Sequence, residues 1–329
     1  MSVQNLPIPS RLRHVANKLS ILRLMEDDDD ENIVFTERDS IWETRGGRPN
    51  ADHFLDFYSD PGLRHAFAAY GVHDALVKRG FAEYHFKITR SDAFHHRLEI
   101  LIGDDDDDDD ETPYSERQVM DLRIHLTALN PTSFEQAPEF SHALPVMVVE
   151  WLTMQNPKLR FTSERPRLPG QRFPGTGMGR VVHSLLLIMA ERLRRHAVIQ
   201  VPEHHHLARL YHRAGYRFAS EKKEMELLSV NKSLSHLPFA VAAWAVERGF
   251  VFQREQPEGP RQPFEYRPQE MALALSREMK HALVPSKGFF QAFLSRSPRA
   301  SFEVDFPGLR QSLFEHPVAG LEASVLEKL

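Results

Sequence analysis

Three consecutive segments in the middle of the chain constrain the fold more than any other feature. Residues 146–154 are nearly all apolar, which predicts a strand covered on both faces. A long loop over residues 160–179 then carries four glycines and several prolines. Apolar residues recur at helical spacing over residues 180–195. They predict an amphipathic helix that begins where the glycines end.

Strands and helices are predicted on both sides of this segment. Alternating or β-branched runs predict strands over residues 84–89, 97–102 and 118–129, after a helix that opens at Asp60-Pro61. Downstream, we expect a strand over residues 197–201, a helix over 203–214 ended by Gly215, and closing strands over 216–219 and 224–230. This order predicts an α+β fold with a mixed sheet flanked by helices.

The chain of 329 residues is long enough for more than one folded unit. We predict an N-terminal extension over residues 1–50, the sheet-containing domain over 51–230, and an α-rich C-terminal region over 231–329. Residues 239–247 and 268–283 of the last region are predicted to be helices. The pattern does not indicate an oligomeric state.

Composition excludes several kinds of site and location. The chain has no cysteine, so disulfides, zinc–thiolate sites and a cysteine nucleophile are excluded. Residues 1–23 contain no uninterrupted apolar run typical of a secretory signal. No window reaches the roughly 20 apolar residues that a membrane-spanning helix needs. We therefore expect a cytoplasmic protein without a membrane partner.

Charge is unevenly distributed along the chain. The formal net charge is −5, but two aspartate runs at residues 27–30 and 104–110 carry much of the negative charge. Their spacing does not match a calcium-binding loop. Residues 158–223 instead hold 14 Lys and Arg against four Glu, which favours an anionic partner such as a phosphorylated cofactor. Nucleic acid is not expected as a partner, because no nucleic-acid-recognition motif is present.

The glycine-rich turn is the segment most suited to hold an anion. Glycine lacks a Cβ, so its main-chain N–H groups can approach a ligand closely. The first turn of the helix that follows supplies unpaired N–H donors and a partial positive charge. Together they predict a phosphate-binding turn. The turn is not a P-loop, since no Gly-Lys-Ser/Thr follows, and it does not match a dinucleotide fingerprint.

Two motifs resemble those of the GNAT superfamily of acyl-CoA N-acyltransferases. The first is motif A, written Arg172-Phe-Pro-Gly175-Thr-Gly177, or in a second register Gly177-Met-Gly179 running into the helix. The second is the helix end Leu210-Tyr211 followed by Gly215-Tyr216, where the family commonly has Gly-Phe. The resemblance covers residues 146–230 and implies a GNAT-like sheet that binds acyl-CoA. Both registers of motif A remain open.

The resemblance implies an N-acyltransferase that moves an acyl group, with acetyl-CoA as donor, to an unidentified amine. The strand over residues 146–154 would bind the pantetheine arm. Glu150 is the candidate general base, if the buried strand raises its pKa, and Tyr211 is the candidate general acid. The candidate cofactor-binding residues are Gln171, Arg172, Gly175, Gly177, Met178, Gly179 and Arg180. The alternative is a non-catalytic GNAT-like module that binds a ligand or protein.

Three consecutive histidines, His204, His205 and His206, lie at the start of the predicted helix over residues 203–214. Adjacent residues at a helix start point in different directions, so this run does not predict three ligands to one metal ion. We therefore predict no metal site. His205 or His206 is an alternative general base.

Overall fold

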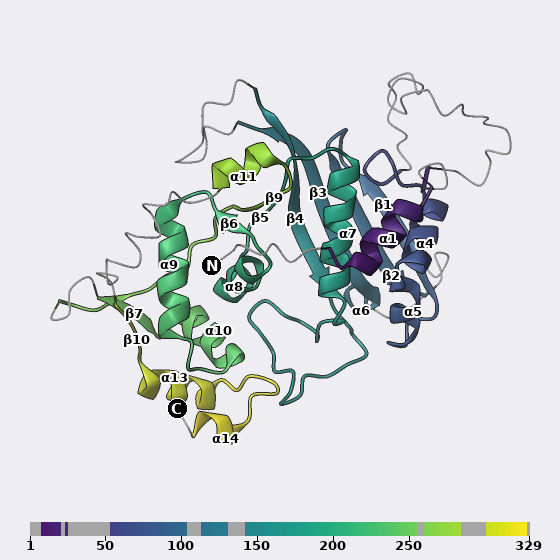
Figure 1. The fold of residues 1–329 in the computed structure, drawn as a ribbon. Helices are drawn as coiled ribbons and strands as arrows, with labels where there is room; N and C mark the ends of the chain where they lie inside the picture. Colours follow the sequence, from purple (N-terminus) through teal and green to yellow (C-terminus); the bar gives the residue numbers. More distant parts are fainter. Residues whose placement is uncertain are drawn as a thin grey trace, which may run out of the picture.

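The computed structural model describes residues 8–20, 24–25, 53–103, 113–130, 142–254, 259–283 and 301–327. Its centre is a seven-stranded sheet in the order β1-β2-β3-β4-β5-β9-β6 (Figure 1). The strands are β1 Tyr84–Arg90, β2 His95–Ile102, β3 Gln118–Leu129, β4 Leu144–Met154, β5 Ala197–Gln200, β9 Met271–Ala274 and β6 Arg217–Phe218. Only β4 and β5 pair in parallel. The predicted mixed α+β class is confirmed.

The sheet is continuous from β1 to β4 and then narrows sharply. β3 and β4 pair along nearly their whole length, with one bulge opposite Arg123 and Ile124. By contrast, β4 pairs with β5 at only three positions, Met147, Val148 and Val149. Beyond Val149, β4 runs on to Met154 without pairing with β5. One strand of the parallel pair therefore extends well past the other.

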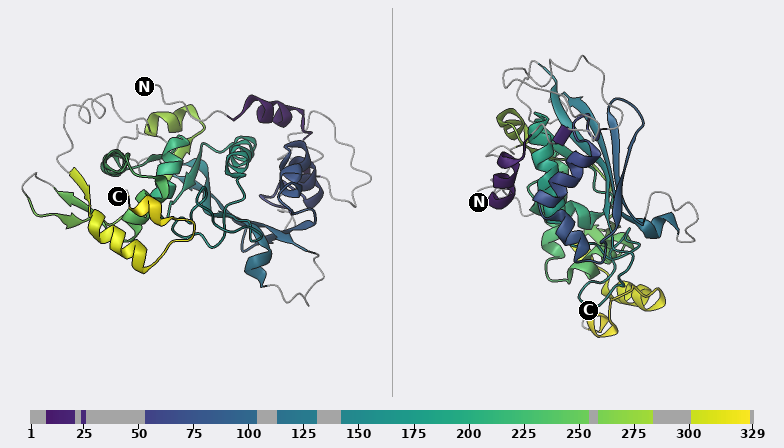
Figure 2. Two further views of the ribbon diagram at one scale, coloured as in Figure 1. Left: turned by 90° about the horizontal axis from the view of Figure 1, so that it is seen from below. Right: turned by 90° about the vertical axis from the view of Figure 1, so that its right-hand side faces the viewer.

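One face of the sheet is covered by helices and holds the largest core. The helices on this side include α1 Ser10–Lys18, α4 Asp60–Ala69 and α7 Gly179–Arg192, and Figure 2 (right) shows all three on one side. Fully buried side chains such as Leu63, Leu98 and Ile124 fill the space between them and the strands. α4 begins where Ser59 accepts a hydrogen bond from the Gly62 N–H at 3.0 Å, an N-cap in front of Pro61.

The opposite face of β1 to β4 is polar. On this face, Arg97 of β2 lies opposite Arg123 of β3, and Arg123 lies opposite Trp151 of β4. The short helix α6 Tyr114–Arg117 lies at this face (Figure 2, right). Asp121 is almost fully buried there and binds the guanidinium groups of Arg97 and Arg123. We call this polar surface the open face.

The C-terminal region contributes to the main sheet, so the predicted division at residue 230 does not separate it from the sheet domain. β9 lies between β5 and β6 and is antiparallel to both. The predicted helix over residues 268–283 is wrong at its start, where β9 forms, and only α11 Arg277–Leu283 is helical. The four apolar residues of β9 are too few for their period to distinguish strand from helix.

The rest of this region is mixed α and β rather than α-rich. The predicted helix over residues 239–247 is confirmed as α10 Phe239–Glu247. A second sheet consists of β7 Val251–Arg254, β8 Gln262–Pro263 and β10 Ser301–Val304, in the order β10-β7-β8 (Figure 1). With α10 and α13 Phe306–Glu315 it encloses a second apolar core. The other elements are α5 Val72–Val77, α8 His205–Arg213, α9 Glu221–Ser233 and α14 Ala323–Leu326.

The predicted closing strand over residues 224–230 is wrong, because the segment belongs to helix α9. Ser220 precedes the helix, and Glu221 and Glu224 lie in its first turn, where negative charge is favourable. The buried Glu224 carboxylate also accepts hydrogen bonds from the Phe218 N–H at 3.1 Å and from His212 Nε2 at 2.7 Å. These contacts fix a helix where the apolar spacing alone suggested a strand.

Both aspartate runs lie outside the described residues. None of the helices within those residues is long and apolar enough to cross a membrane.

Candidate functional site

The glycine-rich loop returns to the end of β4, the strand that extends past β5. The Asn156 N–H donates to the Pro174 carbonyl at 2.7 Å, and the Thr176 N–H donates to the Met154 carbonyl at 3.3 Å. Gly175 therefore lies opposite Gln155 as an isolated antiparallel bridge. The apolar strand and the glycine turn therefore meet at this point.

The start of α7 presents several unpaired N–H groups. The Thr176 side chain accepts from the Met178 N–H at 3.3 Å and orients the first turn. Gly177 has a φ of +75°, a conformation that glycine adopts without steric cost. Within the described residues, main-chain N–H groups without a protein acceptor include those of Gly175, Gly177, Gly179 and Arg180. The last three of these residues are exposed to solvent, so an anion can reach them.

A partly buried contact fixes the position of this turn. The Arg79 Nε donates to the Thr176 carbonyl, and its Nη1 donates to the Ala75 carbonyl at 2.7 Å. Arg79 follows α5, so the turn is attached to the helix pair that precedes the sheet. The guanidinium also adds positive charge beneath the turn, which favours an anion above it.

The other predicted cofactor-binding residues differ in how accessible they are. Gln171 folds back on its own loop, where its Oε1 accepts from the Leu168 N–H at 3.0 Å, and Met178 is buried. Arg172 is exposed, lies over the Phe173 ring at 5.3 Å and is 3.9 Å from Glu116. Of the three side chains, only that of Arg172 is free to approach a ligand from solvent.

Tyr211, the candidate general acid, projects from α8 toward the core on the α7 side of the sheet. Its ring centroid lies 5.5 Å from that of Tyr216. Burial raises the pKa of Tyr211 to about 12, so the phenol stays protonated at neutral pH. The Tyr216 hydroxyl accepts from Gln200 Nε2 at 3.0 Å and lies 3.2 Å from His183 Nε2. Gln200 is also the last β5 residue that pairs with β4.

Glu150, the candidate general base, does not lie in a buried environment. Its side chain is 41% exposed on the open face, so the expectation of a buried carboxylate on a covered strand is wrong. The reason is the β-bulge, at which Glu150 has no partner on β3. Two histidines approach the carboxylate instead, with His95 Nε2 at 3.6 Å and His125 Nδ1 at 3.9 Å from its Oε1.

Sequence reasoning missed this histidine–glutamate cluster. His95 and His125 are directly opposite each other on β2 and β3, and their rings stack with centroids 4.0 Å apart. The alternation of both strands was visible in the sequence. The register that aligns these two positions was not, and neither was the bulge that brings Glu150 to them.

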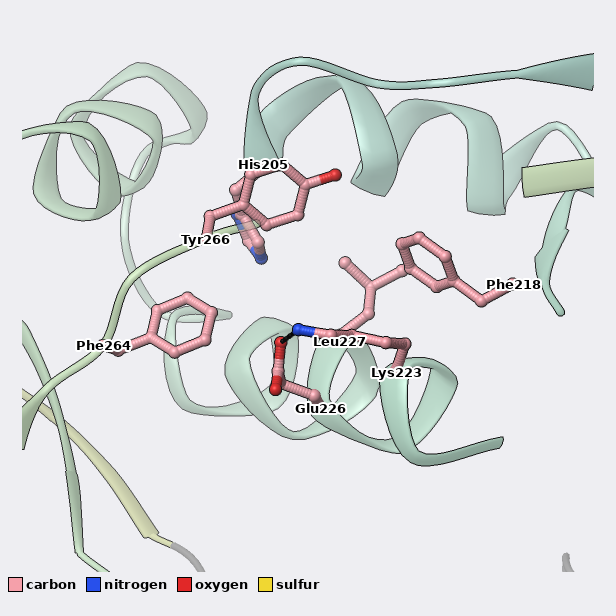
Figure 3. A pocket seen from close by; sticks show the side chains of 7 residues that line it. All are labelled: His205, Phe218, Lys223, Glu226, Leu227, Phe264 and Tyr266. Carbon is pink, nitrogen blue, oxygen red and sulfur yellow. Dashed lines mark hydrogen bonds and ion pairs between the residues drawn. The ribbon is translucent and has the colours of Figure 1, made fainter. Parts of the chain in front are cut away.

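The three consecutive histidines do not form a ligand set. His205 and His206 are each only 4% exposed, and each has one ring nitrogen without a partner among the described residues. His205 borders a pocket with room for about one water molecule, which Figure 3 shows between it, Phe218 and Phe264. Tyr266 covers His205 on one side, and a Lys223–Glu226 ion pair of 2.8 Å closes another (Figure 3).

Comparison with known proteins identifies no relative: no family model, curated protein or solved structure matches the chain. The site is therefore interpreted from its own geometry.

Proposed function

We propose that the protein is an acyl-CoA-dependent N-acyltransferase of the GNAT type, with acetyl-CoA as donor and an amine as acceptor. The observation that carries this proposal is the set of exposed, unpaired N–H groups at the start of α7, next to the end of β4. The order of glycine loop, helix, short strand and second helix, ending at Gly215-Tyr216, also agrees with the sequence resemblance.

The turn is suited to a pyrophosphate and β4 to an extended arm. The N–H groups of Gly175, Gly177 and Gly179 would donate to phosphate oxygens, assisted by the partial positive charge of the helix end. The guanidinium groups of Arg172 and Arg180 are exposed beside them. The part of β4 beyond Val149 pairs with β3 but not with β5. Main-chain groups on its β5 side, other than the Met154 carbonyl that the loop occupies, would hydrogen-bond the amides of a pantetheine chain, as an added strand would.

The chemistry needs one proton acceptor and one proton donor. The neutral acceptor amine attacks the thioester carbonyl and its N–C bond forms. Because Glu150 lies on the open face and Tyr211 on the α7 side of the sheet, the amine proton would pass to the Glu150 carboxylate through water, at the edge of β4 that does not pair with β5. The tetrahedral intermediate then collapses, the C–S bond breaks, and the CoA thiolate takes a proton from the Tyr211 hydroxyl. Burial raises the pKa of Tyr211 to about 12, so the phenol keeps its proton until the thiolate forms. Because a thiol is the stronger acid, this transfer is uphill, and it is completed when solvent returns a proton to the phenolate and takes one from Glu150.

The second candidate is a module that binds CoA or another anion without turnover. The exposure of Glu150 favours it, because a solvated carboxylate is a weaker base than one whose pKa burial has raised. The two candidates share the glycine turn and differ only in whether an amine is acylated.

Calorimetric titration with acetyl-CoA tests the proposal. We expect saturable binding with a Kd on the order of micromolar, and a loss of about 100-fold or more in Gly177→Glu, whose carboxylate would repel the phosphates. Gly249→Glu is the matched control, because Gly249 is exposed, has a φ of +74° and lies outside the loop. Absence of saturable binding by the wild type would exclude the acyltransferase and a module that binds CoA.

Turnover separates the two candidates. With acetyl-CoA and a panel of amines, we expect Tyr211→Phe to lower kcat about 10²-fold or more while acetyl-CoA affinity stays within about twofold. A chain that binds acetyl-CoA, acylates no amine and is indifferent to Tyr211→Phe is the non-catalytic module.

A further inference from the structure

Three potential metal ligands from adjacent strands converge on the open face. They are one ring nitrogen each of His95 on β2 and His125 on β3, and a carboxylate oxygen of Glu150 on β4, all within 4.8 Å of one another. We propose that His95, His125 and Glu150 bind a divalent transition-metal ion, with zinc as the best fit. This inference does not rest on acyl transfer, because it concerns side chains on the open face rather than the glycine turn.

The separations suit a small cation. A tetrahedral zinc ion has bonds of about 2.0–2.2 Å to nitrogen and oxygen, which places its ligand atoms about 3.3 Å apart. Glu150 Oε1 lies 3.6 Å from His95 Nε2 and 3.9 Å from His125 Nδ1, so small side-chain movements close the site. Two imidazoles and one carboxylate are also a recurrent three-ligand set for zinc, with the fourth position left to water or substrate.

A fourth residue orients one of the ligands from behind. Asp92 accepts from His95 Nδ1 at 2.8 Å, which leaves Nε2 of that ring directed at Glu150. The Asp92 carboxylate is itself held by the N–H groups of Phe94 at 2.7 Å and His95 at 3.0 Å. A carboxylate behind a ligating histidine is the usual support of a zinc site.

Metal binding requires one local rearrangement. The His95 and His125 rings are nearly parallel, at 12°, whereas a bound ion lies close to the plane of each imidazole. At least one ring must therefore rotate about its χ2 bond, a torsion with a broad energy profile. Both rings are accessible for this movement, since His95 is 36% and His125 is 30% exposed.

The ion would compete with the role proposed for Glu150. A carboxylate that coordinates zinc cannot also accept the amine proton, so the metal-bound and base roles exclude each other in one molecule. If the protein acylates amines, zinc at saturating concentration should inhibit turnover without weakening acetyl-CoA binding.

Titration of the untagged, metal-stripped full chain with zinc and with cobalt(II) tests the site. We expect one ion per chain and cobalt absorption bands of a tetrahedral complex. His125→Gln and His95→Gln should each weaken binding about 100-fold or more, and Asp92→Asn about 10- to 100-fold. His204→Gln in the histidine run and His73→Gln on α5 are matched controls, expected within about twofold of the wild type.

Two results would overturn the inference: no binding of zinc at about 100 μM, or unchanged stoichiometry and affinity in the His95→Gln/His125→Gln double variant. Circular dichroism of each variant excludes loss of folding as the cause. Acetyl-CoA titration of His125→Gln distinguishes this outcome from failure of the proposed function, because that variant leaves the glycine turn intact.

Discussion

Two groups of histidines in this protein differ in almost every respect. His204, His205 and His206 are consecutive and conspicuous in the sequence, yet the last two are buried and the run does not converge on one point. His95 and His125 are far apart in the sequence, partly exposed and stacked against each other beside Glu150. Sequence proximity therefore says little about convergence. Opposite positions on paired strands bring side chains together. In the run, only the His204 and His206 rings lie near each other, with centroids 5.5 Å apart, and His205 packs against Phe264 and Tyr266.

The largest expected effect is a loss of stability in acid that comes from buried histidines, two in the run and one on β2. Burial lowers the pKa of His205 to about 4, of His206 to about 3 and of His96 to about 4. The histidines of the unfolded chain bind protons near pH 6.5, whereas those of the folded chain bind them only at lower pH. The free energy of unfolding is therefore unaffected by these groups above about pH 6.5, and it decreases as pH falls toward 4. For His205 alone the loss reaches about 3 kcal/mol.

Urea unfolding at intervals between pH 7.5 and 4.5 measures this loss. His205→Phe removes the ionisable group and places an aromatic ring among Phe264, Tyr266 and Phe218. The free energy of unfolding of this variant should therefore vary less with pH. The variant should be more stable than the wild type near pH 5. If the two curves run parallel, burial of His205 is not the source of the pH dependence.

The second effect is a somewhat smaller stabilisation by zinc, and it concerns the partly exposed pair His95 and His125. Zinc at about 100 times its Kd should raise the free energy of unfolding by about 2.7 kcal/mol at pH 7.5, because it binds only the folded chain. Thermal or urea unfolding of the wild type with and without zinc checks this. The gain should vanish in His125→Gln and persist in His204→Gln. A gain of equal size in His125→Gln would locate the ion elsewhere and remove the contrast between the two groups.

The third effect, smaller still, is the change in stability when His95 or His125 is replaced in the absence of metal. Partly exposed side chains contribute little to stability, so His95→Gln and His125→Gln should each change the free energy of unfolding by less than about 1 kcal/mol in the presence of a chelator. Unfolding curves of the metal-free variants measure this. A cost of about 3 kcal/mol in either variant would mean that the stacked pair supports the sheet, which would weaken its assignment as a binding site.

How much of this could be predicted from the sequence depends on whether the information is local. β3 was predicted within its actual bounds, because its alternation is long. β9 was missed, because it has four residues and its neighbours in the sheet come from distant segments. The glycine turn was visible, since its donors are main-chain groups in one short segment. The His95–His125–Glu150 cluster was not, because it needs the register of three strands and a bulge.

The smallest effect concerns His204, the member of the run that retains contact with solvent. Its Nδ1 lies 3.0 Å from Glu247 Oε2, and the two side chains are 21% and 38% exposed. An ion pair of this exposure contributes about 0.5–1 kcal/mol at most. We therefore expect His204→Ala to lower the free energy of unfolding by no more than that at pH 6, and Glu247→Gln to match it in a double-mutant cycle. The dependence of the unfolding free energy on pH should change only slightly, because burial is the largest cause of the lowered pKa of His206 and the charge of His204 is a smaller one. If His204→Ala instead flattened this dependence as much as His205→Phe, the run would titrate as one unit, and the distinction between its buried and solvent-facing members would fail.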